Sequence, residues 1–599
     1  MSNEIEPFLN MLASNQKIAY DVETNGLRWQ SCRVVGYSVS DGKEAYYVPT
    51  RHGGGYNVDN PEAFEAEVAN LIEKREKPLI GHNIKFDSHM SLNHGIELGP
   101  NIRDSMIAAA LLNENQFSFS LENVAKLYPD IPQKQGKELY RYMSNLLGEP
   151  EKGIMGHYWR LAGNDPVGVE YAKHDTLATW HVDDRQFKDL YAQNLDFVYF
   201  MECELTHVLR KMERRGLRID EGRLAALRIK INQMELEAYE KLPVKDDLTP
   251  INVRSNKDLQ EYFTMLDFTD WEFTKPTNRH PHGQPSFNKL FLQSNDAGHI
   301  LLQARTLTDF KNKFLDGIDG FLFNSTIYTN FSQTQGDYGY GTKSGRLSCY
   351  APNLQQVPKR DENLGSLYRE LFVARDGYTF AEFDYSQAEP RLFSHYSGEP
   401  SLIDGYNATP AIDMHSVAAE LMHISRKVAK NLNLGLQYTM GIAKLAKQLG
   451  ISEDEARTMY YSWKGNFPNV SKFTKLASQV AEQRGYVKTI LNRRARFPDP
   501  RWAYRAANRI VQGGSADILK YKIVQLDRWI CENGHEENIR MLLNIHDAIV
   551  FEIEDNILDE AITNIKRIME DVQTHPFNLK VPFIADYKTG KDWRIATYE

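Results

Sequence analysis

The sequence predicts a multidomain protein of the mixed α/β (α+β) class. Its 599 residues are too many for one hydrophobic core, and a typical domain size of about 150 residues suggests roughly three to five units. The first 190 residues begin with the short β-rich runs KIAYDVE, RVVGYSVS and EAYYVPT, followed by helical patterns. From about residue 340 strands and helices alternate again, around a mostly helical block between 400 and 490.

The segments between these two regions predict long helices and one loop. From 195 to 240 apolar and charged residues alternate at helical spacing, with a break at RRGLRID. The polar stretch TKPTNRHPHGQPS at 274–286 is typical of a loop. No internal repeat is present, which excludes a solenoid.

Composition excludes several classes of protein. Apolar residues make up 42% of the chain, charged residues 25%, and the mean hydropathy is −0.52, which is typical of an ordered globular protein. No run of about 18 apolar residues could span a bilayer, and the N-terminus lacks signal and transit patterns. We therefore predict a cytoplasmic protein with no membrane partner.

Cysteine positions and net charge give weaker evidence on the kinds of site and partner. Cys32, Cys203, Cys349 and Cys531 are far apart and show no CxxC pattern, so we expect free thiols and no zinc site. The net charge of −9 argues only weakly against a nucleic-acid partner. Acidic metal ligands would contribute to that total, while basic side chains cluster at 214–218 and 491–501.

Two carboxylates lie close together on the first predicted strand. In IAYDVETNGL, strand alternation puts Ile18, Tyr20 and Val22 on one face and Asp21 with Glu23 on the other. Like charges repel, and a divalent cation such as Mg²⁺ or Mn²⁺ would stabilise the pair. Taken alone, the pair also fits a solvated strand face.

Two further segments strengthen the metal-site interpretation. GHNIKFDSHM supplies Asp87, and YAKHDTLATW places Tyr171 and Asp175 on one face of a helix, although such a pair is also common on helix surfaces. In this order the three segments match the sequence blocks of the DEDDy proofreading exonucleases. The resemblance implies a domain with a ribonuclease-H-like fold. This domain would digest single-stranded DNA from its 3′ end. Asp21, Glu23, Asp87 and Asp175 would then hold two metals, and Tyr171 would orient the attacking water.

The C-terminal half contains two isolated aspartates at predicted strand ends. Asp384 ends an apolar strand, and Ser386 to Glu389 form a predicted capping box, with Pro390 in the first helical turn. MLLNIHDAIVFEI predicts a hairpin with His546 and Asp547 at its tip. A carboxylate on so apolar a support is costly unless a cation meets it. We therefore predict that Asp384 and Asp547 share a second metal site. Glu389 also fits a role in capping alone.

A predicted helix at 426–441 places two cations, an apolar residue and an aromatic residue on one face. These are Arg426, Lys430, Leu434 and Tyr438, at successive four-residue steps. An amphipathic helix with a basic solvent edge explains the pattern equally well when it is taken in isolation.

Together DYSQAE, the 426–441 helix and HDAIVFE resemble the motifs of family A DNA polymerases, the DNA polymerase I type. The resemblance implies a right-hand polymerase of thumb, palm and fingers that uses primer-template DNA, dNTPs and Mg²⁺. Two ions are expected in each active site, with Mn²⁺ as a substitute. Lys430 would also protonate the pyrophosphate leaving group. The implied nucleotide contacts are Arg426, Lys430, Leu434, Tyr438, Tyr385 and Glu389, and the implied DNA contacts are Arg346, Asn353, Gln356, Asn508, Gln512 and His546.

The same resemblance implies domain limits. They are an exonuclease domain at 1–190, thumb with the N-terminal palm segment at 191–345, palm at 346–415, fingers at 416–495 and palm at 496–599. Segments 213–220 and 304–314 resemble thumb pieces with basic residues suited to phosphate. The exonuclease blocks begin at residue 21, so we expect a phage-like enzyme without the 5′ nuclease domain. No processivity or replisome partner leaves a recognisable motif.

The sequence departs from the family pattern at four positions. Leu434 replaces an aromatic residue, Ala548 replaces the third carboxylate after His-Asp, Thr439 replaces glycine and Pro390 replaces leucine. None removes an essential carboxylate or cation.

Two rival functions remain. A single-subunit RNA polymerase would share the palm, although Glu389 favours DNA synthesis because the resemblance implies that it excludes the ribose 2′-hydroxyl. A DNA-binding or nuclease-only protein would not require Arg426, Lys430, Asp384 and Asp547 together.

Overall fold

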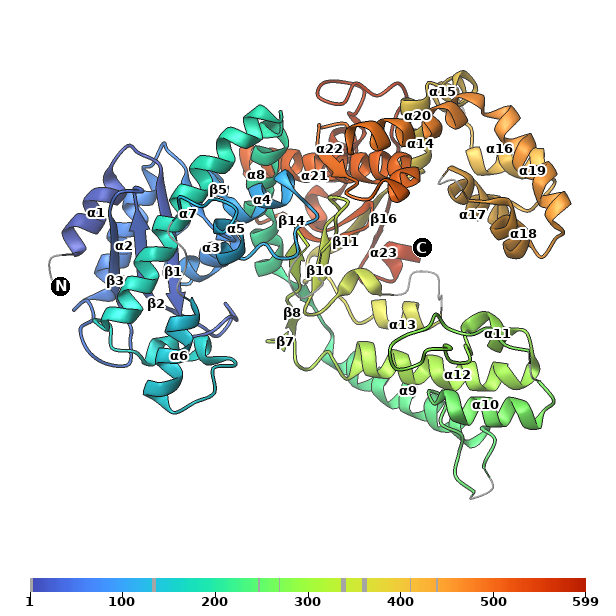
Figure 1. Cartoon of the computed structure of the whole chain (residues 1–599), viewed down its shortest axis with the longest axis horizontal. Helices are drawn as coiled ribbons and strands as arrows, with labels where there is room; N and C mark the ends of the chain where they lie inside the picture. The colour runs from blue at the N-terminus through green and yellow to red at the C-terminus, as the bar shows by residue number, and fades with distance from the viewer. Residues whose placement is uncertain are drawn as a thin grey trace.

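The computed structural model describes residues 4–131, 136–245, 248–268, 270–335, 341–357, 363–409, 411–437 and 440–598. Figure 1 shows an N-terminal domain on the left, a central sheet and two helical arms on the right. The lower arm consists of α9–α12 and the upper arm of α16–α20. This arrangement is the predicted multidomain mixture of helices and sheets.

The N-terminal domain contains a five-stranded sheet of order β3-β2-β1-β4-β5. β1 lies in the centre because it pairs antiparallel with β2 and parallel with β4. Every residue of β2 is buried. The strands are β1 (Ile18–Thr24), β2 (Val34–Ser40), β3 (Ala45–Pro49), β4 (Leu79–Gly81) and β5 (Ile102–Asp104).

Helices pack on both sides of this sheet. The long helix α7 contacts β1, β2, β3 and β4, and α3 packs beside β1. Asp165 is the N-cap of α7, because its side chain accepts hydrogen bonds from the main-chain N–H groups of Val167 and Gly168. The helices are α1 (Ile5–Ala13), α2 (Pro61–Glu73), α3 (Ile84–Leu92), α4 (Ser105–Leu112), α5 (Leu121–Ala125), α6 (Gly136–Leu147), η1 (Ile154–Arg160) and α7 (Pro166–Ala192).

The central sheet is antiparallel and has the order β14-β15-β11-β16. β14 and β15 form the predicted hairpin, with His546 at φ 54° in its two-residue turn. Helices α21 and α22 lie above this sheet in Figure 1. The elements are β11 (Tyr378–Tyr385), β14 (Ile539–Ile545), β15 (Ala548–Glu554), β16 (Ala585–Gly590), α14 (Ala388–Ser397), α21 (Ala506–Glu532), α22 (Leu558–Glu570) and α23 (Ile595–Tyr598).

The predicted long helices are α8 (Asp196–Arg215) and α9 (Glu221–Glu240), separated at Gly216. Gly216 has φ +60°, which favours glycine and ends α8. The lower arm continues with α10 (Asn256–Met265), α11 (Lys289–Gln293) and α12 (Asp296–Phe310). The upper arm comprises α16 (Met414–Met422), α17 (Arg426–Gln437), α18 (Ile442–Leu449), α19 (Glu453–Asn466) and α20 (Pro468–Arg484).

Other predictions of secondary structure can be compared directly. Residues 274–286 contain no helix, as predicted, and 400–490 is mostly helical. The capping-box prediction is wrong: α14 begins at Ala388, its N-cap Gln387 has φ 56°, and no side chain caps it. Glu389 instead pairs with Arg346. All four cysteines are free thiols. In the described part of the chain, no helix is long and apolar enough to cross a membrane.

Candidate active sites

The first candidate site lies at β1 in the N-terminal domain. The main-chain N–H of Val22 donates to Asp87 Oδ1 at 3.0 Å, which brings this carboxylate to the main chain of β1. Asp87 is on α3 and is buried. Asn83 immediately precedes α3 in the left-handed conformation, with φ 62°.

The charges of the predicted acidic residues act on one another and on Tyr171. Burial, followed by the charge of Asp21, raises the pKa of Asp87 well above its usual range. Burial also raises the pKa of Tyr171, followed by the charges of Asp175, Glu23 and Asp21. Tyr171 and Asp175 line a cavity of about 370 Å³ beside α6. The structure therefore brings together all five residues predicted for the exonuclease site.

The second candidate site lies at the end of the central sheet. Asp384 pairs in register with Ala548 on one side, and the main-chain N–H of Tyr385 lies 3.4 Å from the carbonyl oxygen of Asp547. The two predicted metal-binding aspartates are therefore on neighbouring strand ends. More than 160 residues separate them in the sequence.

Both aspartates line a cavity of about 730 Å³. Arg426 and Lys430 reach the same cavity from α17, as do Arg346, Glu389 and His546 from other segments. Arg426 is exposed and forms an ion pair with Asp413. Acidic groups and two cations thus line one open space, an arrangement suited to a triphosphate with bound metal.

Glu389 and Arg346 form an ion pair inside this cavity. The Nη2 atom of Arg346 lies 2.5 Å from Glu389 Oε1 and 3.9 Å from Asp547 Oδ1. Burial raises the pKa of Glu389, and the neighbouring Arg346 charge opposes that rise. Arg346 therefore links the residue predicted to select the sugar with a predicted metal ligand.

Several predicted contacts are placed differently from what the sequence suggested. The Tyr385 ring is buried and its hydroxyl donates to the carbonyl of Met569 at 2.7 Å, so we expect its main chain, and not its hydroxyl, to face a nucleotide. The Asn353 side chain accepts a hydrogen bond from the N–H of Gln355 and caps a short helix. Gln356 is exposed. Tyr438, Thr439 and the side chain of Leu434 lie outside the described residues.

Asn508 and Gln512 lie on α21, and both are partly exposed. The Oδ1 atom of Asn508 is buried and lacks a hydrogen-bond partner. Arg214 and Arg215, predicted for phosphate, are used elsewhere. Arg214 stacks on Trp29, and Arg215 is partly buried and donates to the carbonyl of Met541.

The structure adds three residues that sequence reasoning missed. Asp586 on β16 pairs directly with Asp384 and lines the same cavity. Ser515 Oγ lies 3.2 Å from Asp547 Oδ1, and Asp413 pairs with Arg426. The only sequence signal for Ser515 was its position one turn beyond Gln512, in QGGSADILK.

The donor chemistry of both sites fits hard divalent cations. The N-terminal site contains four carboxylates, three of them largely buried, and burying a carboxylate is costly without a neutralising cation. Among the described residues, no group of three or more acidic, histidine or cysteine side chains is already gathered closely enough to hold a metal.

Comparison with known proteins decides the family. Residues 222–595 match the model described as DNA polymerase family A. The chain belongs to this family. Residues 1–188 match the 3′-5′ exonuclease model, so the chain is a family A DNA polymerase with a 3′-5′ exonuclease domain.

Relatives of this polymerase include phage and bacterial enzymes. It is 28% identical to DNA polymerase DpoZ of Acinetobacter phage SH-Ab 15497, over 97% of each chain. It is 27% identical to DNA polymerase I of Chloroflexus aurantiacus, over 98% of this chain and 62% of that protein. The fold resembles the POL domain of Pol1 from M. smegmatis, solved in complex with DNA primer-template and dNTP. The TM-score is 0.82, with 23% identity and 99% coverage of both chains.

Proposed function

We propose that this polymerase extends a DNA primer with dNTPs in genome replication and removes mispaired 3′ ends, with two Mg²⁺ ions in each active site. Mn²⁺ would substitute for Mg²⁺. The observation that supports this most strongly is that Asp384, Asp547, Arg426 and Lys430 line one cavity although they come from three separate segments. The complex of the M. smegmatis POL domain with primer-template and dNTP also supports these substrates.

The polymerase site would act mainly by positioning and charge. Asp384 and Asp547 would hold the ions, which supply charge neutralisation and an activated primer 3′-hydroxyl when bound. Arg426 and Lys430 would bind the triphosphate oxygens, and Lys430 would donate a proton to the leaving pyrophosphate. Arg346 would contact the primer end beside Asp547.

The exonuclease site would use the same principle for hydrolysis. Asp21, Glu23, Asp87 and Asp175 would hold the ions that activate a water. A tyrosine hydroxyl is protonated at neutral pH, and burial raises the pKa of Tyr171 further, so this hydroxyl would donate a hydrogen bond that orients the water. The substrate would be the 3′ end of a single DNA strand.

Replacing Glu389 tests both the polymerase site and the rival RNA polymerase function. We expect the native enzyme to extend a DNA primer with dNTPs and to reject rNTPs. Glu389→Ala should raise rNTP incorporation relative to dNTP by about tenfold or more, equivalent to ~1.4 kcal/mol, because the buried side chain beside Asp547 would no longer occupy the sugar site. The measurement is single-nucleotide extension with matched dNTP and rNTP. Equal use of both by the native enzyme would refute the assignment.

Replacing Arg426 tests nucleotide binding. We expect Arg426→Ala to raise the KM for dNTP by about tenfold, since one charge-assisted contact to phosphate is lost, while digestion of single-stranded DNA stays unchanged. Steady-state extension kinetics measure this. Arg457→Ala, which changes an exposed arginine on α19, is the matched control and should leave KM unaltered.

A further inference from the structure

Helix α8 connects the two halves of the enzyme and carries two fully buried glutamates. Glu202 and Glu213 are each 1% exposed. Eleven residues separate them, which is about three helical turns or ~16 Å, so they lie on nearly the same face of α8. A buried carboxylate is costly unless it is paired and hydrogen-bonded. Each of these glutamates therefore needs defined partners.

The partners of Glu213 belong to the exonuclease domain and to a neighbouring strand. Its Oε1 atom lies 2.5 Å from Lys85 Nζ and accepts the N–H of Phe331 at 2.6 Å. Its Oε2 atom lies 2.6 Å from His89 Nε2. The charge of Lys85 and these hydrogen bonds outweigh burial and lower the pKa of Glu213, so the carboxylate is ionised at neutral pH.

Lys85 and His89 are on the helix that carries Asp87. They are four residues apart and share one face of α3, whereas Asp87 is two residues from each and faces the opposite side. Asp87 meets β1, and the other face of α3 meets Glu213. Glu213 therefore binds the face of α3 opposite to the face that carries Asp87, a proposed metal ligand.

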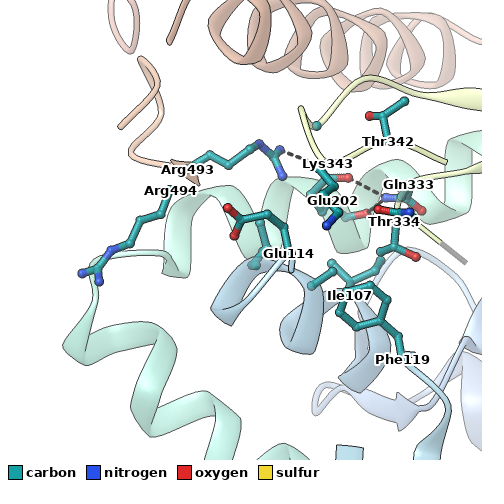
Figure 2. Close-up of a pocket in the computed structure, with 14 residues that line it drawn as sticks. Ile107, Glu114, Phe119, Glu202, Gln333, Thr334, Thr342, Lys343, Arg493 and Arg494 are labelled. Atoms are coloured by element: carbon teal, nitrogen blue, oxygen red, sulfur yellow. Dashed lines mark hydrogen bonds and ion pairs between the residues drawn. The ribbon is translucent and has the colours of Figure 1, made fainter. Parts of the chain in front are cut away.

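The partners of Glu202 include Arg493, which contacts the loop beside the polymerase site. Its Oε1 atom lies 2.5 Å from Arg493 Nη2 and 2.7 Å from Lys520 Nζ, and Gln333 Nε2 donates to its Oε2 at 2.7 Å. Figure 2 shows Arg493 and Gln333 meeting Glu202 beside Ile107 and Phe119 of the N-terminal domain. Arg493 also pairs with buried Asp517 at 2.7 Å.

Arg493 in turn supports the loop that carries Arg346. Gly345 lies so close to the Arg493 guanidinium that a Cβ atom there would be 2.8 Å from Arg493 Nε. Gly345 also has φ +85°, a conformation that other residues rarely adopt. The next residue, Arg346, pairs with Glu389 and approaches Asp547.

We propose that α8 is a brace in which Glu213 positions the exonuclease helix α3 and Glu202 positions the Arg346 loop. Both are positioning residues, since neither reaches a proposed reacting group. The inference rests on the proposed roles of Asp87 and Arg346. A displacement of about 1 Å at such a group costs on the order of 100-fold in rate, so each glutamate should affect one activity selectively.

Two variants with crossed outcomes test the brace. Glu213→Gln should lower the kcat for digestion of single-stranded DNA at least tenfold, with KM for that strand and the rate of primer extension within twofold. Glu202→Gln should raise the Kd for primer-template, measured during primer extension, at least fivefold. The rate of digestion of single-stranded DNA should stay within twofold. Hydrogen exchange should rise in 84–92 for Glu213→Gln and in 341–357 for Glu202→Gln.

Matched controls separate the outcomes. Glu204→Gln changes a glutamate of the same helix that pairs with exposed Arg528, and it should alter neither activity. If Glu213→Gln does not fold, Lys85→Gln, which keeps the contacts of Glu213 to His89 and Phe331, should show the same selective loss. Asp21→Ala with Glu23→Ala tests the exonuclease site itself, so that failure of the site and failure of the brace are distinguishable.

Two results would overturn the proposal. One is an equal loss of both activities in Glu213→Gln or in Glu202→Gln, and the other is no loss of activity in both of these variants.

Discussion

Asp547→Ala should reduce primer extension by about 1,000-fold or more, equivalent to ~4 kcal/mol, and leave digestion of single-stranded DNA within twofold. Asp547 lies at the tip of the β14–β15 hairpin, directly beside the end of β11 that carries Asp384. Removing it takes away half of the proposed metal-binding pair. The exonuclease site is built from a different sheet, so its activity should persist. The measurement is rapid-quench extension and digestion of the same labelled primer.

Asp376→Ala is a suitable control for this variant. Asp376 precedes β11, and its side chain is fully exposed, so its loss should leave extension unchanged. The assignment of Asp547 as a metal ligand is wrong if purified Asp547→Ala extends the primer at a rate near that of the native enzyme.

Asp21→Ala with Glu23→Ala should give the opposite result. Digestion of single-stranded DNA should fall by about 1,000-fold or more, because two of four carboxylates leave the exonuclease site. Extension should stay within twofold, and misincorporated nucleotides should accumulate because mispaired ends persist. Digestion of a labelled single strand and extension from a mismatched primer measure both effects.

A matched double variant checks that the loss is specific to this site. Asp59 and Glu67 are exposed acidic residues of the same domain, so Asp59→Ala with Glu67→Ala should digest DNA normally. Retained digestion by Asp21→Ala with Glu23→Ala would place the exonuclease chemistry elsewhere.

Local patterns in the sequence predicted much of both sites. Strand alternation placed Asp21 and Glu23 together, helical spacing placed Tyr171 with Asp175, and the apolar arms around His546 and Asp547 predicted the hairpin. These predictions hold because each depends on the period of one element. The capping box at Ser386 failed because α14 begins at Ala388 with Gln387 at the N-cap, and the Glu389 side chain pairs with Arg346.

Contacts between distant segments could not be predicted in this way. Asp586 pairs with Asp384 through the register of β11 and β16, which are 200 residues apart in the chain. The partners of Glu202 and Glu213 come from four other segments, and helical spacing in α8 shows only that both glutamates share a face. The proximity of Asp384 and Asp547 was predicted from the cost of carboxylates at apolar strand ends and from the family resemblance, whereas the strand pairing that produces it is seen only in the structure.

Anomalous diffraction from a crystal grown with primer-template, a non-hydrolysable dNTP analogue and Mn²⁺ would test the central claim most directly. We expect two manganese peaks beside the triphosphate, with carboxylate oxygens of both Asp384 and Asp547 at about 2.1 Å from the ions. Peaks that contact neither aspartate, or only one of them, would contradict the proposal that this pair holds the metals for nucleotide addition.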